Sequence, residues 1–421
     1  MTGFIRILRE NFSPLKIANF RRYFTGQAIS LIGTWLQLTA QGWVVWELSH
    51  SEAALGVVAM LGTLPILLLG PWAGVWADRL NRRRLLIGTQ CGAMILAFIL
   101  AGLTQAGIVQ LWHVYVLSGL LGVITAIDFP AQQAFIGDLS GIAEVRKAVN
   151  VNSMIVQISR MAGPALAGLV ISALGAATAF WINGLSFLAV IVSLLVVRSS
   201  QARTQPTNAS ALGEFRDALG FIRTQPRLVD LIVFVMIVAF FGISVINIMP
   251  AVASEVLKGD ARTLGYLLAS AGAGALVGTV ILVPYTQSLR KTGIVVGSAV
   301  FWMGIWYMIL SISTWLPLSL LSIFASGLAA PVVFTMAIGL LQVMAPPGMR
   351  ARLLSLFVMV SFGMQPLASL LVGASAQVLG TPLAILINGL FLLAGPLMML
   401  ATRPNLRRWE LSLQPVKIPG D

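Results

Sequence analysis

Charged residues are scarce in this sequence. They make up 10% of its 421 residues, whereas soluble domains usually carry about 25%. Hydrophobic residues make up 58%, and the mean hydropathy is +0.91. Such a composition excludes a soluble globular domain, because this chain has too little polar surface to face water. We therefore predict an all-α integral membrane protein that crosses the bilayer many times.

Cysteine and histidine are also nearly absent. The single Cys91 excludes an intramolecular disulfide. His50 and His113 stand far apart, and neither belongs to a cluster of acids with metal-ligand spacing. The sequence has no phosphate-binding loop, no paired catalytic carboxylates and no soluble domain that could bind ATP. We therefore expect no metal, no cofactor and no enzyme activity.

The basic excess, a formal net charge of +13, has a topological explanation. Lys and Arg occur in short groups between apolar runs, as the tendency of basic loops to stay cytoplasmic requires. We therefore expect no nucleic-acid partner.

Long apolar runs divide the chain into twelve predicted spans of roughly 20 residues or more. With both termini in the cytoplasm, every Lys and Arg except Arg160, Lys258 and Arg262 falls on the inner side. The predicted spans are 24–46, 55–77, 85–103, 111–135, 148–173, 177–197, 228–252, 264–283, 294–312, 316–343, 353–378 and 383–401.

The spans are grouped in two predicted six-helix bundles, 1–197 and 228–403, which are joined by a cytoplasmic linker, 198–227, and followed by a cytoplasmic tail, 404–421. The linker is either a short interfacial helix or a plain solvated connector. Residues 173–185 are echoed by 378–390, with Leu, Gly, Ala, Ile, Asn, Gly and Leu at matching positions. This echo indicates a parallel repeat of the two halves.

Polar residues follow one face of several predicted helices. In the first span they fall within about 80° of arc at 100° per residue. Because lipid-facing polar stripes are costly, we expect these faces to meet around a water-accessible cavity. The alternative is that they join helices through interhelical hydrogen bonds. The set is Gln27, Ser30, Thr34, Gln37, Gln41, Ser118, Thr125, Asp128, Gln132, Ser153, Gln157 and Arg160.

The second half offers a less polar lining that includes aromatic rings. The predicted cavity residues there are Phe240, Phe241, Ser244, Asn247, Ser322, Ser326 and Gln365. A cavity with one polar and one aromatic wall suits a bulky amphipathic solute.

Asp128 and Arg160 are the two charges placed within the membrane thickness. An intramembrane carboxylate is a candidate for proton coupling, because low hydration lets it exchange a proton near working pH. Arg160 would hold a substrate anion or modulate that acid. The alternatives are a structural ion pair between helices and, for Asp128, an acid at a helix end.

The stretch 74–84 breaks an apolar run with an acid and four arginines, so it must lie at a water face. Its pattern resembles the loop signature of the major facilitator superfamily, between the second and third helices. The resemblance implies a fold of twelve helices in two halves, with Asp78 as a conformational latch. The gating residues would be Gly74, Asp78, Arg79, Arg82 and Arg83. The matching turn near Arg290 lacks the acid.

A second resemblance lies in the fifth span, where Gly163, Pro164 and Gly168 are similar to the glycine-proline motif of proton-coupled exporters. Ala167 replaces one glycine of that motif, and the fourth span lacks the arginine common in drug antiporters. Residues 19–24 and 128–135 resemble the branch of transmembrane secretion effectors that contains enterobactin exporters and macrolide-efflux proteins.

The resemblance implies a monomeric exporter in the bacterial inner membrane that uses the proton gradient to move an amphipathic molecule, such as a siderophore or an antibiotic. A proton-linked importer and a lipid or lysolipid flippase of the same fold are alternatives. A non-transporting receptor is a third, but it would leave the polar faces unexplained.

Overall fold

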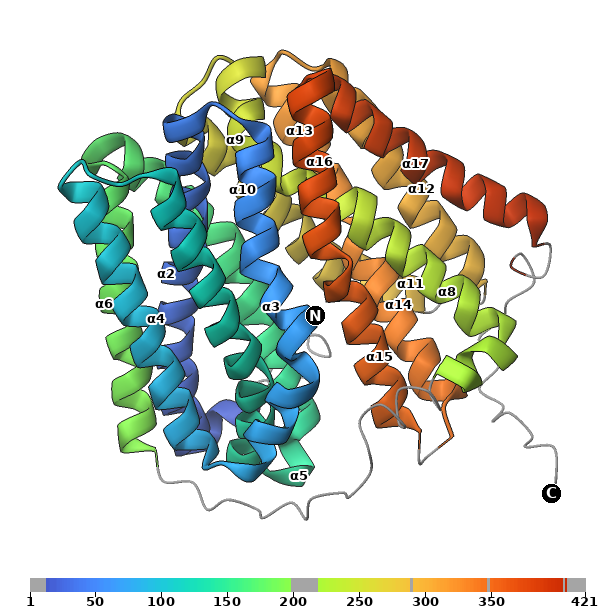
Figure 1. Ribbon diagram of the computed structural model, residues 1–421. Helices are drawn as coiled ribbons and strands as arrows, with labels where there is room; N and C mark the ends of the chain where they lie inside the picture. Colours follow the sequence, from blue (N-terminus) through green and yellow to red (C-terminus); the bar gives the residue numbers. More distant parts are fainter. Residues whose placement is uncertain (1–12, 198–218, 288–290, 347–348, 404–405, 407–421) are drawn as a thin grey trace, which may run out of the picture. The chain divides into compact units, whose positions relative to one another are not determined.

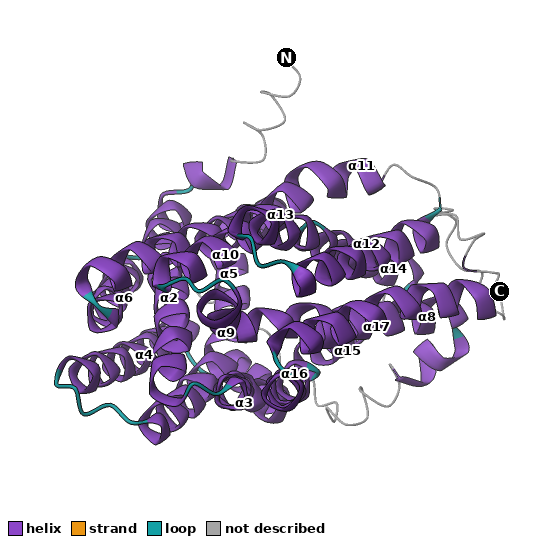
Figure 2. Cartoon of the chain, turned by 90° about the horizontal axis from the view of Figure 1, so that it is seen from above, coloured by secondary structure: helices purple, strands orange, loops and turns teal. Residues whose placement is uncertain are grey.

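A computed structural model describes residues 13–197, 219–287, 291–346, 349–403 and 406. Its labelled elements are all helices (Figures 1 and 2). The chain folds into two compact units. Unit 1 comprises Met1–Ala54, Leu61–Thr207 and Lys258–Ala269; unit 2 comprises Leu55–Met60, Asn208–Leu257 and Ser270–Asp421. The domain boundaries drawn from the sequence stay a prediction.

The first helices of the chain are η1 (Ser13–Lys16), α2 (Ala18–Ser49), α3 (Glu52–Arg79), α4 (Arg82–Gln105), α5 (Leu111–Leu174) and α6 (Ala176–Val196). In unit 1, α2 packs against both α5 and α6, and α4 packs against the same two helices (Figure 1). Side chains cap two of the starts: Ser51 accepts a hydrogen bond from the Ala54 amide, and Asn81 accepts one from the Arg84 amide. Such caps satisfy amides that the first helical turn leaves unpaired.

The helix α5 is two segments joined at a sharp bend. Gly141 has a φ of 72° inside it, a left-handed value that favours glycine. The bend separates the apolar segments Leu111–Gly141 and Lys147–Leu174, which contain the fourth and fifth predicted spans. The predicted spans end at 135 and begin again at 148, and the chain between them is helical up to the bend and beyond it.

The later helices of the chain are α8 (Pro226–Ile237), η2 (Val238–Gly242), η3 (Ile243–Ile248), α9 (Met249–Ala251), η4 (Val252–Val256), α10 (Ala261–Val277), η5 (Gly278–Leu282), α11 (Val283–Gln287), α12 (Thr292–Ile312), α13 (Leu316–Gly327), α14 (Ala329–Met344), α15 (Arg350–Gly363), α16 (Gln365–Leu379) and α17 (Thr381–Thr402). In unit 2, α12 packs along α17. Residues 219–224 of the predicted linker are helical, and the part before residue 219 lies outside the described residues.

Three segments are π-helical: η2, η4 and η5. A π-helical turn shifts the hydrogen-bond register and is frequent at functional sites. The first predicted span of the second half, 228–252, is therefore irregular, although its sequence reads as one continuous apolar run.

Eleven helical segments among the described residues are long and apolar enough to cross a membrane. The helix α2 is long enough, at 32 residues, but does not meet that hydropathy requirement. Its glutamines, including Gln27, Gln37 and Gln41, lower the hydropathy. The protein is thus a multi-pass membrane protein, and α2 as a further crossing stays a prediction.

The echo between residues 173–185 and 378–390 has a structural counterpart. Gly175 ends α5 and begins α6 at a φ of 83°, and Gly380 ends α16 and begins α17 at a φ of 88°. Each turn is followed by a buried asparagine, Asn183 or Asn388. The repeated sequence thus forms the same helix-glycine-helix turn twice.

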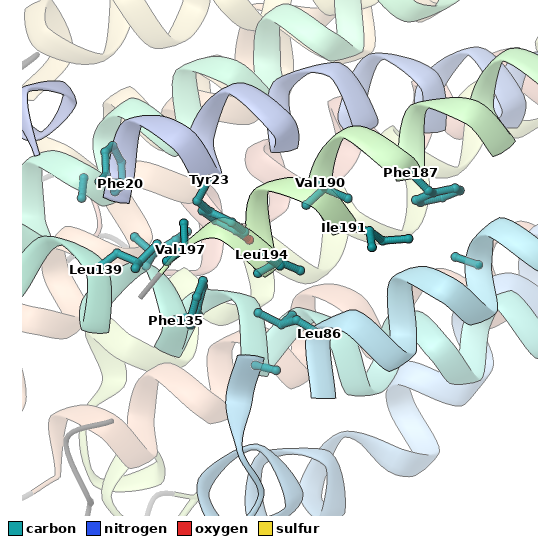
Figure 3. Packing of buried hydrophobic residues seen from close by; sticks show 14 of the residues in the cluster. Phe20, Tyr23, Leu86, Phe135, Leu139, Phe187, Val190, Ile191, Leu194 and Val197 are labelled. Atoms are coloured by element: carbon teal, nitrogen blue, oxygen red, sulfur yellow. The ribbon is translucent and has the colours of Figure 1, made fainter. Parts of the chain in front are cut away.

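The core of unit 1 gathers aromatic and branched side chains where α2 begins and α6 ends (Figure 3). Tyr23 meets Phe135 edge to face, with ring centroids 5.2 Å apart, a preferred geometry for aromatic pairs. Leu86 and Leu194 are buried in the same cluster. This core fixes α2, α4, α5 and α6 relative to one another and so positions the polar groups described next.

Candidate functional site

The polar face of α2 is buried in unit 1. The Gln41 side-chain amide donates to the Ser118 hydroxyl of α5 at 2.8 Å, and the Asn183 side-chain amide of α6 donates to the Gln37 side-chain oxygen Oε1 at 2.7 Å. Gln27 and Ser30 are buried as well. These four α2 side chains meet protein rather than solvent in this structure, and two of them form the interhelical hydrogen bonds that were the alternative to a cavity.

Other residues of the predicted polar faces are less buried. Thr34 is partly buried, and its hydroxyl donates to the Ser30 carbonyl at 2.9 Å. Thr125 and Ser153 are exposed, and each donates to a carbonyl of its own helix. Gln132 and Gln157 are partly buried. The assignment of these five residues to a cavity stays a prediction.

Asp128 is held by two neutral donors from α4. The Thr89 hydroxyl donates to Asp128 Oδ1 at 2.5 Å, and the Gln90 amide donates to the same oxygen at 3.0 Å. Both donors are buried, and no Lys or Arg of the described part of the chain forms an ion pair with Asp128. A carboxylate with neutral partners can take up or release a proton without breaking an ion pair.

Arg160 contacts an aromatic ring of α2 and does not pair with Asp128. Its guanidinium carbon is 5.4 Å from the centre of the Trp35 ring of α2, in the geometry of a cation–π contact.

The glycine-proline motif of the fifth span, Gly163, Pro164 and Gly168, lies in α5 close to that contact. A Cβ at Gly163 would come within 3.0 Å of the Ile32 carbonyl and would press against the Trp35 side chain. A Cβ at Gly168 would meet the Ala261 carbonyl at 2.9 Å. Pro164 is buried between them, inside α5. The glycines thus permit close helix packing, as small residues commonly do in membrane proteins.

Two of the predicted polar residues of the second half join separate segments of unit 2, and three bond within their own segment. The Asn247 amide donates to the Ser369 hydroxyl at 2.8 Å, and the Gln365 amide donates to the Ala239 carbonyl at 3.3 Å. Ser244, Ser322 and Ser326 are buried, and each donates to a carbonyl three or four residues earlier.

The predicted aromatic wall lies on the π-helical turn η2. Phe240 and Phe241 have ring centroids 4.8 Å apart, and Phe241 stacks on Phe391 of α17 at 4.5 Å. Both phenylalanines are partly buried. Phe241 thus contacts both its neighbour Phe240 and a third ring from α17, and the sequence pattern did not predict this third ring.

The predicted gating stretch contains one buried ion pair. Arg82 contacts both carboxylate oxygens of Asp138, at 2.9 and 3.0 Å. Arg83 donates to the carbonyls of Leu194 and Leu195 at the end of α6, at 2.5 and 2.6 Å. Both arginines therefore tie the start of α4 to other helices.

The remaining predicted gating residues are Gly74, Asp78 and Arg79. Helix α3 includes them, but their side chains lie outside the described residues.

Sequence reasoning did not identify Asp138, Thr89, Gln90, Asn183 or Ser369 as partners at these sites. Asp138 carried a usable signal, because it is an acid near the end of the fourth apolar segment and faces a basic stretch. The others are uncharged and carried none. No group of three His, Cys, Asp or Glu side chains could hold a metal within the described ranges.

Comparison with known proteins places the chain among transporters. The family model of transmembrane secretion effectors matches residues 9–418. The staphyloferrin A transporter of Staphylococcus aureus is 24% identical over 62% of this chain, and the alignment covers 66% of that relative, just under two thirds of its length. Macrolide efflux protein A of Streptococcus pyogenes is 24% identical over 93% of this chain and 95% of its own.

The solved structure of the nucleoside transporter NupG shares the fold, with a TM-score of 0.72 at 13% identity, over 91% of this chain and 98% of that one. The family match over nearly the whole length, the many apolar helices and the export relatives agree. The chain therefore belongs to the transmembrane secretion effector family of major facilitator transporters.

Proposed function

We propose that this protein is a secondary active transporter that exports an amphipathic small molecule, siderophore-like or drug-like, across the bacterial inner membrane. It would work by alternating access between two six-helix bundles, with α2 as a twelfth crossing and both termini in the cytoplasm. Protons would move inward as the solute moves outward. The protein would act as a monomer and need no cofactor.

One observation carries the export proposal. The relative that aligns over 93% of this chain is named for macrolide efflux, and a second relative is named for transport of the siderophore staphyloferrin A. The partly buried rings Phe240 and Phe241 would suit the apolar part of an amphipathic solute.

The coupling proposal rests on Asp128. It lies within the apolar segment Leu111–Gly141, and its donors Thr89 and Gln90 are uncharged. A proton on this carboxylate would not need to displace a cation. Arg160 lies over Trp35, so we propose that it contacts the solute and takes no part in proton transfer.

Export is tested by the direction of solute movement. The purified chain is reconstituted in liposomes, and a panel of siderophores and macrolides is offered under an imposed pH gradient. The proposal predicts that solute moves toward the side with the higher proton concentration, against the inward proton flow. Movement with the protons would identify an importer instead. No movement of any solute, with a lipid probe flipped between leaflets, would identify a flippase.

A further inference from the structure

A groove runs along unit 1 between the first three turns of α2 and the last two turns of α6. It has a volume of about 440 Å³. Both helices contribute residues at i, i+3, i+4 and i+7, which is one face of each helix. The lining residues are Arg22, Thr25, Gly26 and Ile29, with Arg21, on α2, and Ala189, Val192, Ser193 and Val196 on α6.

The floor of the groove is a tight helix contact. A Cβ at Gly26 would meet the Ala189 carbonyl at 2.6 Å, so only glycine permits this approach. Seven residues of helix span about 10 Å at 1.5 Å per residue, which sets the length of the groove. The groove is thus a feature of the packed backbone and does not depend on one rotamer.

The walls are apolar and uncovered. Ile29, Val192 and Val196 are each about half exposed, at 49, 56 and 52%. In a membrane protein, such side chains face hydrocarbon. A channel between them has the shape to take an acyl chain.

The end of the groove where α2 begins is basic. Arg21 and Arg22 are exposed, and neither guanidinium has a hydrogen bond or an ion pair to a described residue. Near the end of α6, the Leu194 and Leu195 carbonyls accept hydrogen bonds from Arg83 instead. The two guanidinium groups are therefore available to an anion from outside the protein.

The neutral polar groups of the groove are also engaged. Thr25 donates to the Arg21 carbonyl at 2.8 Å, and Ser193 donates to the Val190 carbonyl at 2.7 Å. Specific recognition in the groove would therefore come from the arginines alone. Guanidinium groups prefer phosphate, which they bind through two parallel hydrogen bonds.

We propose that this groove is a binding site for one anionic phospholipid of the leaflet at which α2 begins, with its phosphate on Arg21 and Arg22 and an acyl chain between Ile29, Val192 and Val196. The basic bias of the loops assigns that leaflet to the cytoplasm. The lipid would brace α2 against α6. The inference depends on the chain lying in a membrane and not on the export proposal.

Native mass spectrometry of the full chain in detergent tests this site, with dioleoyl phosphatidylglycerol as the probe and dioleoyl phosphatidylcholine for comparison. Wild type should bind one phosphatidylglycerol more tightly than phosphatidylcholine. The variant Arg21→Gln/Arg22→Gln should lose at least about tenfold in phosphatidylglycerol affinity, since each basic residue near anionic lipid contributes about 1 kcal/mol. Arg21→Lys/Arg22→Lys should retain most of the preference.

Two further variants separate a built groove from general attraction to anionic lipid. Val192→Trp fills the channel without changing charge, so it should weaken both lipids. Arg227→Gln, which removes an exposed arginine near the start of α8, should bind as wild type does. Unchanged phosphatidylglycerol binding in the Arg21/Arg22 glutamine variant or in Val192→Trp would overturn the proposal. Full displacement of the lipid by glycerol phosphate at equal concentration would also overturn the proposal, because the acyl chain of the lipid would then contribute nothing to binding.

Discussion

Arg82 and Asp138 form a buried ion pair that joins the start of α4 to the part of α5 just before its bend at Gly141. Their side chains are 10 and 7% exposed, and the arginine reaches both carboxylate oxygens. An acid from another helix thus holds Arg82 of the predicted gating stretch.

Removing one partner of this pair should be costly. Asp138→Asn leaves Arg82 without its carboxylate in a buried site, where breaking an ion pair costs about 3–5 kcal/mol. We expect a clear loss of thermal stability, measured by size-exclusion chromatography after heating in detergent. The exchange Arg82→Asp/Asp138→Arg should recover part of it. Arg84→Gln is the matched control, because the Arg84 side chain is exposed. If Asp138→Asn melts as wild type does, the pair contributes no stability.

Gly163, in the glycine-proline motif of α5, should tolerate no side chain. Gly163→Ala introduces a methyl group 3.0 Å from the Ile32 carbonyl and against Trp35, so α2 and α5 must separate. Stability should fall, although alanine is the better helix former by about 1 kcal/mol. Gly88→Ala should be neutral or stabilising, because nothing lies within 4 Å of its added methyl group. Equal melting temperatures for the two variants would show that Gly163 is not a packing contact.

The helices could be predicted from the sequence, because apolar runs of the right length report them directly. Every predicted span overlaps described helical segments, and 177–197 extends one residue past the end of α6. The hydrogen-bond partners could not be predicted. Gln37 pairs with Asn183 because of how α2 and α6 are rotated about their axes, and a pattern along one helix carries no information on that rotation. The bend at Gly141 could not be predicted either, because helix-forming residues flank it on both sides.

A surface cluster should make the docking of the N-terminal turn dependent on pH. Glu144 lies between two apolar segments, and its pKa is lowered by a hydrogen bond from Ser13 and by the ammonium of Lys147, 3.1 Å away. A lowered pKa means that ionised Glu144 favours the docked state. This stabilisation is fully present above pH 4.5, the ordinary value, and is lost as the pH falls through the lowered value.

Hydrogen exchange of η1 measures this effect. Protection of Ser13–Lys16 should be constant from neutral pH down to the ordinary glutamate range and should fall as the pH drops below that range. Glu144→Gln should show weak protection at every pH, with no transition. A wild-type protein whose protection does not change over the whole range would show that the cluster does not hold η1.

The central claim is that Asp128 carries the proton that drives export. The most direct measurement is solute transport in proteoliposomes as a function of pH gradient, with Asp128→Asn beside wild type. The variant keeps an acceptor for Thr89 and Gln90 but cannot lose a proton. Glu255→Gln, the same change at an exposed carboxylate, is the control. We predict that Asp128→Asn binds solute and exchanges it between the two sides but no longer responds to the gradient, while Glu255→Gln responds as wild type does. Gradient-driven export that persists in Asp128→Asn would contradict the account.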